Sequence, residues 1–367
     1  MNNKVTFGRW ETITVLLNSM GIPILLGFPR GMVELGGTAG WLICIYITVL
    51  ALALFYIISR LYKPFEGMDP LDLGERIAGN AGRIIVGLIF FTHSTFIVSM
   101  ILREFGEDMK VIALTVSPIS FVQLFFITGM IVGAYKGIEA VVRMHSVVVV
   151  LISAGVLILV IFVMPFFKFG NIYPILGNGP EKIFGTGFFR VSSFSALIII
   201  YMVFPFIKSH EQFRTAGFWG IGLTGFFMTL VTLTFIGVLP YPISLEQFLP
   251  VYQLSRIINV GRFFERIESV FMLLWASAAL LYLSFAFIII LRIFQKAFKL
   301  PYYRPLILPF AVILFTLSLL PPNVMTALNL EAIFFRSYAW LTTFLFMIIL
   351  LITARFVSKK EKGRIKT

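Results

Sequence analysis

An apolar stretch near the N-terminus carries residues that a simple membrane anchor does not need. Residues 18–29 read NSMGIPILLGFP. A proline removes one backbone donor and clashes with the preceding turn, and a glycine lets a ligand approach the backbone closely. N–H groups that become available where a second half-helix begins suit a carboxylate. The stretch therefore predicts a helix break at Gly21 and Pro23 that lines a binding cavity, with an ordinary proline kink as the alternative.

A second segment has a comparable pattern. Residues 194–205 read FSALIIIYMVFP, and aligning Phe204 on Phe28 places Ser195 on Ser19, nine residues before the aromatic ring in both segments. In transporters with inverted repeats, two broken helices meet near the membrane midplane and form the binding site. We therefore predict a second break, at Ser195 with Pro205 following it.

Two further groups of polar residues lie at membrane depth. His93 stands in the sequence Thr-His-Ser-Thr, where it could bind a ligand, carry a proton or hydrogen-bond to a neighbouring helix. Ala278 and Tyr282 are four residues apart, so a helix places them on one face, with a small gap beside a hydroxyl-bearing ring. Simple packing explains this pair equally well.

Patterns typical of enzymes and of metal sites do not occur in the sequence. There is no Ser/His/Asp set, no Walker loop and no metal-ligand spacing, so we expect no enzyme activity, cofactor or metal. The acidic residues 104, 107 and 108 occur beside Arg103 and Lys110, which favours a solvated ion-pair face. The sequence indicates no buried carboxylate beside the first break, and hence no obvious partner for a ligand amine.

The composition requires a membrane. The chain has 367 residues, of which 59% are hydrophobic and 13% charged, whereas a soluble domain is about a quarter charged. About 20 apolar residues in a helix cross a bilayer. On this basis we expect ten transmembrane helices, at residues 11–29, 38–59, 82–102, 119–135, 146–167, 191–207, 218–239, 267–293, 305–320 and 337–356.

The basic residues indicate the orientation. The net charge of +13 gathers at the ends of apolar runs and in the tail 357–367, which indicates anionic lipid and not nucleic acid. With both termini cytoplasmic, the inner segments hold roughly 20 basic residues and the outer ones roughly 10. We predict a single transmembrane domain, 1–367, with one repeat over about 11–167 and an inverted one over about 191–356.

Three stretches carry a family resemblance: GIPILLGFPR (21–30), FPFIKSHEQFRTAG (204–217) and NVGRFFERIESVFMLLW (259–275). Together with the length and the basic tail, they resemble the spore germination permeases, the B subunits of nutrient germinant receptors, over essentially the whole chain. The resemblance implies the amino acid–polyamine–organocation (APC) superfamily and its all-α LeuT-type fold, an inverted 5+5 repeat with discontinuous helices 1 and 6. It places the ligand between spans one, three, six and eight, at Ser19, Gly21, Ile22, His93, Ile97, Ala196, Leu197, Ala278 and Tyr282.

The expected function follows from this resemblance. It implies a germinant-sensing subunit in the spore inner membrane that binds a small nutrient, often an amino acid. It also implies two partners, an A-type membrane subunit and a C-type lipoprotein. An autonomous amino-acid transporter of the same fold is the alternative. A purely structural membrane scaffold fits the composition but leaves the two breaks unexplained.

Overall fold

A computed structural model describes residues 6–258, 267–331 and 336–364, and the regular elements in these ranges are helices joined by loops, without a β-strand. The helices of the first half are α1 (Arg9–Leu25), α2 (Phe28–Gly36), α3 (Gly40–Tyr62), α4 (Pro70–Ile112), α5 (Ile119–Lys136) and α6 (Ile138–Val163). Those of the second half are η5 (Glu181–Gly185), η6 (Thr186–Leu197), α7 (Ile198–Val203), η7 (Phe204–Phe206), α8 (His210–Val238), α9 (Pro250–Ile257), α10 (Ile267–Ala297), α11 (Ile307–Leu319), α12 (Val324–Leu330), α13 (Arg336–Trp340), η11 (Leu341–Phe346) and α14 (Met347–Arg364).

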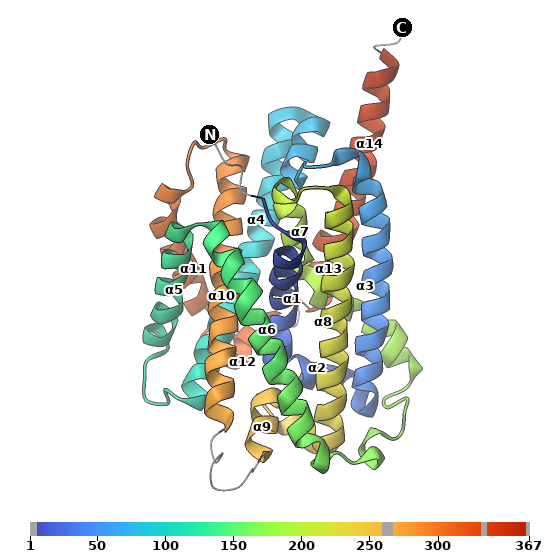
Figure 1. Cartoon of the computed structure of the whole chain (residues 1–367), viewed down its shortest axis with the longest axis vertical. Helices are drawn as coiled ribbons and strands as arrows, with labels where there is room; N and C mark the ends of the chain where they lie inside the picture. The colour runs from blue at the N-terminus through green and yellow to red at the C-terminus, as the bar shows by residue number, and fades with distance from the viewer. Residues whose placement is uncertain (1–5, 259–266, 332–335, 365–367) are drawn as a thin grey trace.

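The helices form one elongated bundle with both termini at the same end (Figure 1). We call this the terminal end. Within the described residues, eight helical stretches are long and apolar enough to cross a membrane, and Arg304–Leu319 is a shorter apolar helix. The first predicted span divides into α1, which has 17 residues, and α2, which joins α3 in one apolar stretch, Phe28–Phe65.

The first helix breaks later than the sequence predicted. α1 continues through Gly21 and Pro23 and ends at Leu25, where the Leu26 N–H donates to the carbonyl of Pro23 at 3.1 Å. A proline near the end of a helix loses only one backbone bond, so the helix reaches its last turn. Gly27 then forms the N-cap of α2. Pro29 occupies the first turn of α2, where the missing backbone N–H costs no hydrogen bond.

The second irregular segment is a change of helix type. Residues Thr186–Leu197 form the 3-10 helix η6, and the α-helical geometry of α7 begins at Ile198. The predicted break at Ser195 therefore lies inside the 3-10 region, two residues before its end. Figure 1 shows that α1–α2 and η6–α7 run in opposite directions through the bundle.

Close packing holds the central helices together. α1 contacts α6, α8, η6 and α10. α3 and α8 pack where glycines meet larger side chains: a Cβ on Gly217 would collide with the ring of Phe55, and one on Gly225 would collide with Thr48. The glycines of α8 thus allow α3 to approach closely.

The start of the chain is tied to the end of α7 and η7. The Phe7 N–H donates to the carbonyl of Phe206 at 2.8 Å, and the two rings stack with centroids 5.4 Å apart. The side-chain amide of Gln212 donates to the carbonyl of Phe7 at 2.8 Å. These contacts hold the N-terminal segment beside α7 at the terminal end.

Candidate functional site

The break between α1 and α2 lines a small cavity of about 10 Å³. Its lining residues come from the break itself, from α4, from η6 and from the residue after α12: Pro23, Leu26, Gly27, Phe28, Met32, Glu104, Ser193 and Glu331. A volume of about 10–15 Å³ holds about one water molecule. The cavity is therefore too small for a larger ligand unless the surrounding helices separate.

Buried carboxylates surround this cavity, contrary to the sequence-based expectation. Glu104 is 5% exposed and Glu331 is 8% exposed. Asp108, one turn beyond Glu104, is 1% exposed, and neither of its carboxylate oxygens has a hydrogen-bond partner. Within the same cluster, Arg103 forms an ion pair with Glu107 at 2.7 Å. The predicted solvated face is wrong because α12 packs against α4 and removes it from solvent.

The opposite wall of the cavity is the start of α2. Its N-cap is Gly27, and no side chain caps the helix there. The uncapped start of a helix attracts negative charge through its backbone N–H groups and its dipole. The cavity thus brings a helix N-terminus close to two carboxylates, Glu104 and Glu331. This combination is complementary to a molecule with a carboxylate at one end and an ammonium at the other.

The two serines that the sequence aligned share a further property. Ser19 on α1 and Ser195 on η6 are 2% and 1% exposed, and neither hydroxyl has a hydrogen-bond partner within the part of the chain that the structure describes. The carbonyl of Ser195 does accept a hydrogen bond, from Thr343 of η11 at 3.3 Å. A buried hydroxyl without a partner costs free energy. Both serines are thus available to a ligand that reaches the packed centre.

The other predicted ligand residues of spans one, six and eight lie in packed surroundings. Ile22, Leu197, Ala278 and Tyr282 are buried, and Ala196 is half-buried. They belong to α1, η6 and α10, and α1 contacts both other helices. Of the predicted break residues, Pro23 lines the cavity at the break, whereas Pro205 lines a separate cavity at the terminal end.

Three of the predicted ligand residues, one on α1 and two on the third predicted span, line cavities other than the one at the break. Gly21 lines a cavity of about 40 Å³ against α6 and α8, away from the break. His93 and Ile97 line a groove of about 630 Å³ between α4 and the α13–η11 segment. The His93 Nε2 atom is buried there without a hydrogen-bond partner. The structure therefore does not bring His93 and Gly21 into one cavity.

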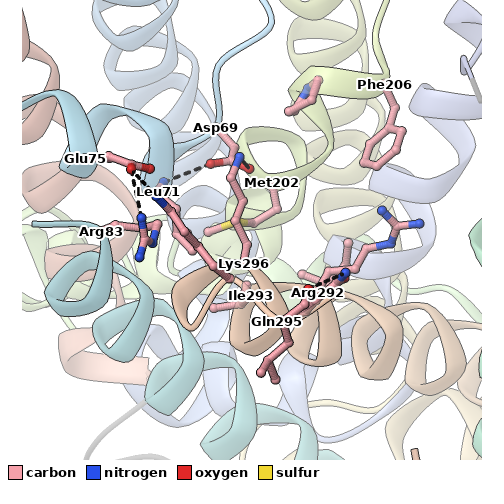
Figure 2. A pocket seen from close by; sticks show the side chains of 14 residues that line it. Asp69, Leu71, Glu75, Arg83, Met202, Phe206, Arg292, Ile293, Gln295 and Lys296 are labelled. Carbon is pink, nitrogen blue, oxygen red and sulfur yellow. Dashed lines mark hydrogen bonds and ion pairs between the residues drawn. The ribbon is translucent and has the colours of Figure 1, made fainter. Parts of the chain in front are cut away.

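A third cavity, of about 460 Å³, opens at the terminal end between the start of α4, α7–η7 and the end of α10 (Figure 2). Asp69, the N-cap of α4, accepts hydrogen bonds from the backbone N–H groups of Leu71 and Asp72 at 3.0 and 3.1 Å. Burial raises the pKa of the Asp69 carboxyl to about 6, although Lys296 lies 2.6 Å away.

A metal site is not apparent in the part of the chain that the structure describes, where no three His, Cys, Asp or Glu side chains are arranged to hold an ion. The sequence analysis did not predict Glu331 as a site residue. The pattern that could have indicated it is a single acidic residue in a long apolar region.

Comparisons with known proteins agree with this architecture. The family model described as "Spore germination protein" matches residues 11–326. Spore germination protein KB of Bacillus subtilis (strain 168) is 23% identical over 266 residues, which cover 71% of this chain and 70% of the relative. Spore germination protein B2 of the same organism is 23% identical over 280 residues, with 75% and 74% covered.

Solved structures show the same fold at low identity. One is Mhp1, a nucleobase-cation-symport-1 family transporter in a closed conformation with bromovinylhydantoin bound. It matches with a TM-score of 0.69 and 13% identity over 97% of this chain and 94% of that one. MhsT in complex with L-phenylalanine matches with a TM-score of 0.65 and 14% identity over 96% and 89%. The predicted all-α, LeuT-type fold is thereby confirmed, whereas the count of ten membrane helices and the inverted 5+5 repeat stay predictions.

Proposed function

The chain belongs to the spore germination protein family of membrane permeases, and from this premise we propose that it is the nutrient-sensing subunit of a germinant receptor, with an amino acid as its ligand. The ligand binds at the break of the first span. Its carboxylate lies at the start of α2, and its ammonium lies between Glu104 and Glu331. Ser19 and Ser195 supply hydroxyls to the part of the ligand that reaches the packed centre.

The observation that carries this proposal is the pairing of opposite electrostatic ends around one cavity. An uncapped helix start and two buried carboxylates line the same small space. A zwitterion is complementary in charge to both, whereas a simple cation or anion is complementary to only one. The family and its fold neighbours are permease-like and transporter-like and do not suggest an enzyme.

Binding is coupled to a change of conformation because the cavity is small. An amino acid does not fit into about 10 Å³, so α2, α4 and Glu331 move apart to admit it. A ligand shifts such an equilibrium only by its differential affinity for the two arrangements. In the proposed receptor, an A-type membrane subunit and a C-type lipoprotein detect this movement in the spore inner membrane, with both termini of this chain cytoplasmic.

A thermal-shift screen of free amino acids on the purified full chain tests the proposal. We expect at least one amino acid to raise the melting temperature, and its des-amino analogue to have no effect. Glu104→Gln and Glu331→Gln remove the partners of the ammonium and abolish the response. Glu139→Gln is the matched control, because Glu139 is half exposed and pairs only with Arg143 on the surface of α6. An equal response in all four proteins places the ligand elsewhere.

An autonomous amino-acid transporter is the second candidate, favoured by the likeness of the fold to Mhp1, a nucleobase-cation-symport-1 family transporter. Saturable counterflow of the identified amino acid by the chain alone in liposomes distinguishes the two functions. A transporter exchanges the amino acid without any partner. The proposed sensor binds the amino acid without exchanging it.

A further inference from the structure

The cavity at the terminal end contains more positive than negative charge. Three acidic residues at the start of α4 face three basic partners. Lys296 lies 2.6 Å from Asp69 and 2.7 Å from Asp72. Glu75 lies 2.8 Å from Arg83 and 2.9 Å from Lys299. Each of these six charges has at least one partner of opposite sign, so this group is neutral as a whole.

Arg292 is a basic residue of the same cavity that takes no part in this network of ion pairs. It lines the same cavity, on the turn of α10 before Lys296. Within the described ranges, its guanidinium forms no ion pair and no hydrogen bond, and its Nε atom is buried without a partner. Arg83, by comparison, has Glu75, Asn80 and the carbonyl of Ala297 as partners. The surplus of one positive charge is therefore located at Arg292.

Aromatic rings hold the guanidinium in place without neutralising it. Its central carbon lies 4.8 Å from the ring centroid of Phe206 and 5.5 Å from that of Tyr303. Figure 2 shows Arg292 extending from α10 towards Phe206, away from the carboxylates of Asp69 and Glu75. A cation–π contact orients a guanidinium but leaves its N–H donors unused. The donors thus remain available to an acceptor in the cavity.

We propose that this cavity binds a small oxyanion, a carboxylate or phosphate group that pairs with Arg292. A guanidinium is the side chain best suited to such groups, because it offers parallel N–H donors in a fixed plane. The cavity volume of about 460 Å³ lies within the range of small-molecule sites. The oxyanion comes either from a soluble molecule or from the headgroup of an anionic lipid. The site is separate from the cavity at the break and needs no nutrient.

Thermal denaturation of the full chain in neutral detergent tests the site. Sodium acetate and sodium phosphate are compared with sodium chloride at equal ionic strength. A second arm uses nanodiscs of phosphatidylglycerol against phosphatidylcholine. We expect acetate, phosphate or phosphatidylglycerol to raise the melting temperature by about 2 °C or more. A response to the free anions identifies a soluble ligand, and a response confined to phosphatidylglycerol identifies a lipid headgroup.

Variants of the cavity separate a specific site from a general effect of charge. Arg292→Gln loses the response, whereas Lys299→Gln, which removes a paired cation from the same cavity, retains it. Gln295→Glu introduces a carboxylate of almost the same shape one turn from Arg292 and also loses the response, since the anion is then supplied from within. Gln295→Ala retains it and controls for the lost amide. No response in the wild type, or an equal response in Arg292→Gln, overturns the proposal.

Discussion

Asn18 of α1 donates a hydrogen bond from its side-chain amide to the carbonyl of Ala278 in α10, across 3.0 Å in the buried centre of the bundle. The bond joins the first and eighth predicted spans, and the two bonded residues are 260 positions apart in the sequence. The backbone carbonyl it uses belongs to one of the predicted ligand residues. The polar residue that made the first segment unusual therefore has a structural partner, independent of any ligand.

Replacing Asn18 with leucine should lower stability. The change removes the amide and leaves the carbonyl of Ala278 with one acceptor position unfilled, at a cost of about 1–3 kcal/mol. The measurement is thermal unfolding in detergent without ligand. Ser277→Ala is the control, because its hydroxyl bonds only to Leu273 on its own helix. An unchanged melting temperature for Asn18→Leu contradicts the importance of this contact.

Gly21 should tolerate alanine. A Cβ at this position meets only Ile24, at 4.0 Å, so it fits without a clash. Gly21 also lies inside a regular helix, where Gly→Ala favours the folded state by about 0.5–1 kcal/mol. We expect Gly21→Ala to melt at the same temperature as the wild type or higher.

Gly217→Ala is the counterpart of this substitution within α8. Its Cβ would collide with the ring of Phe55, so this variant should melt well below the wild type. Both proteins are measured in the same detergent. If Gly21→Ala is the less stable of the two, the helix does not continue through Gly21 and the earlier prediction of a break there is restored.

The hydroxyls of Ser19 and Ser195 should contribute to ligand binding and not to the stability of the ligand-free protein. Because the hydroxyls of Ser19 and Ser195 have no hydrogen-bond partner among the described residues, Ser19→Ala and Ser195→Ala should leave the melting temperature without ligand unchanged or raise it. Each should reduce the shift produced by an amino acid. Ser192→Ala provides the contrast, since that hydroxyl accepts from the Trp340 N–H at 3.2 Å and its loss should destabilise the empty protein.

The stability of the terminal end should depend on pH through Asp69. Its pKa is raised from 3.8 to about 6 in the folded chain, chiefly by burial. Between about pH 4 and 6 the folded state retains a proton that the unfolded state has released, so stability falls as pH rises through this window. A pKa difference of about two corresponds to roughly 3 kcal/mol.

Melting temperatures from pH 4 to pH 7.5 test this dependence. The wild type should lose stability relative to Asp69→Asn between about pH 4 and 6, because asparagine does not titrate. Asp72→Asn, which also removes a partner of Lys296, should still lose stability across this window, because burial and not Asp72 is the largest cause of the raised pKa of Asp69. Parallel curves for the wild type and Asp69→Asn exclude Asp69 as the source.

Local patterns in the sequence predicted the membrane helices and the irregular first and sixth segments. Apolar length is a property of each helix alone, and the alignment of Ser195 on Ser19 required only matching spacing. The position of the first break was wrong because two prolines compete for it. Pro23 kinks a helix that is already formed, whereas Pro29 favours the start of a new one after Gly27.

The burial of Glu104 could not be predicted from its neighbours in sequence. A cluster of acidic and basic residues in a helix is usually solvated, and only the approach of α12, more than 200 residues later, encloses it. The position of Glu331 beside the break likewise depends on the fold and not on its neighbours in the sequence. Sequence patterns predict elements well because elements are local, and they predict this cavity poorly because its walls come from four distant segments.

The contact between Phe7 and Phe206 also constrains how the chain is made. The N-terminal segment cannot reach its final position until the sixth predicted span has been synthesised, about 200 residues later. At ~5–20 residues per second, this delay is about 10–40 s. During that time the backbone and the ring of Phe7 lack their partner in Phe206. Completion of the sixth span is then the step that closes the terminal end.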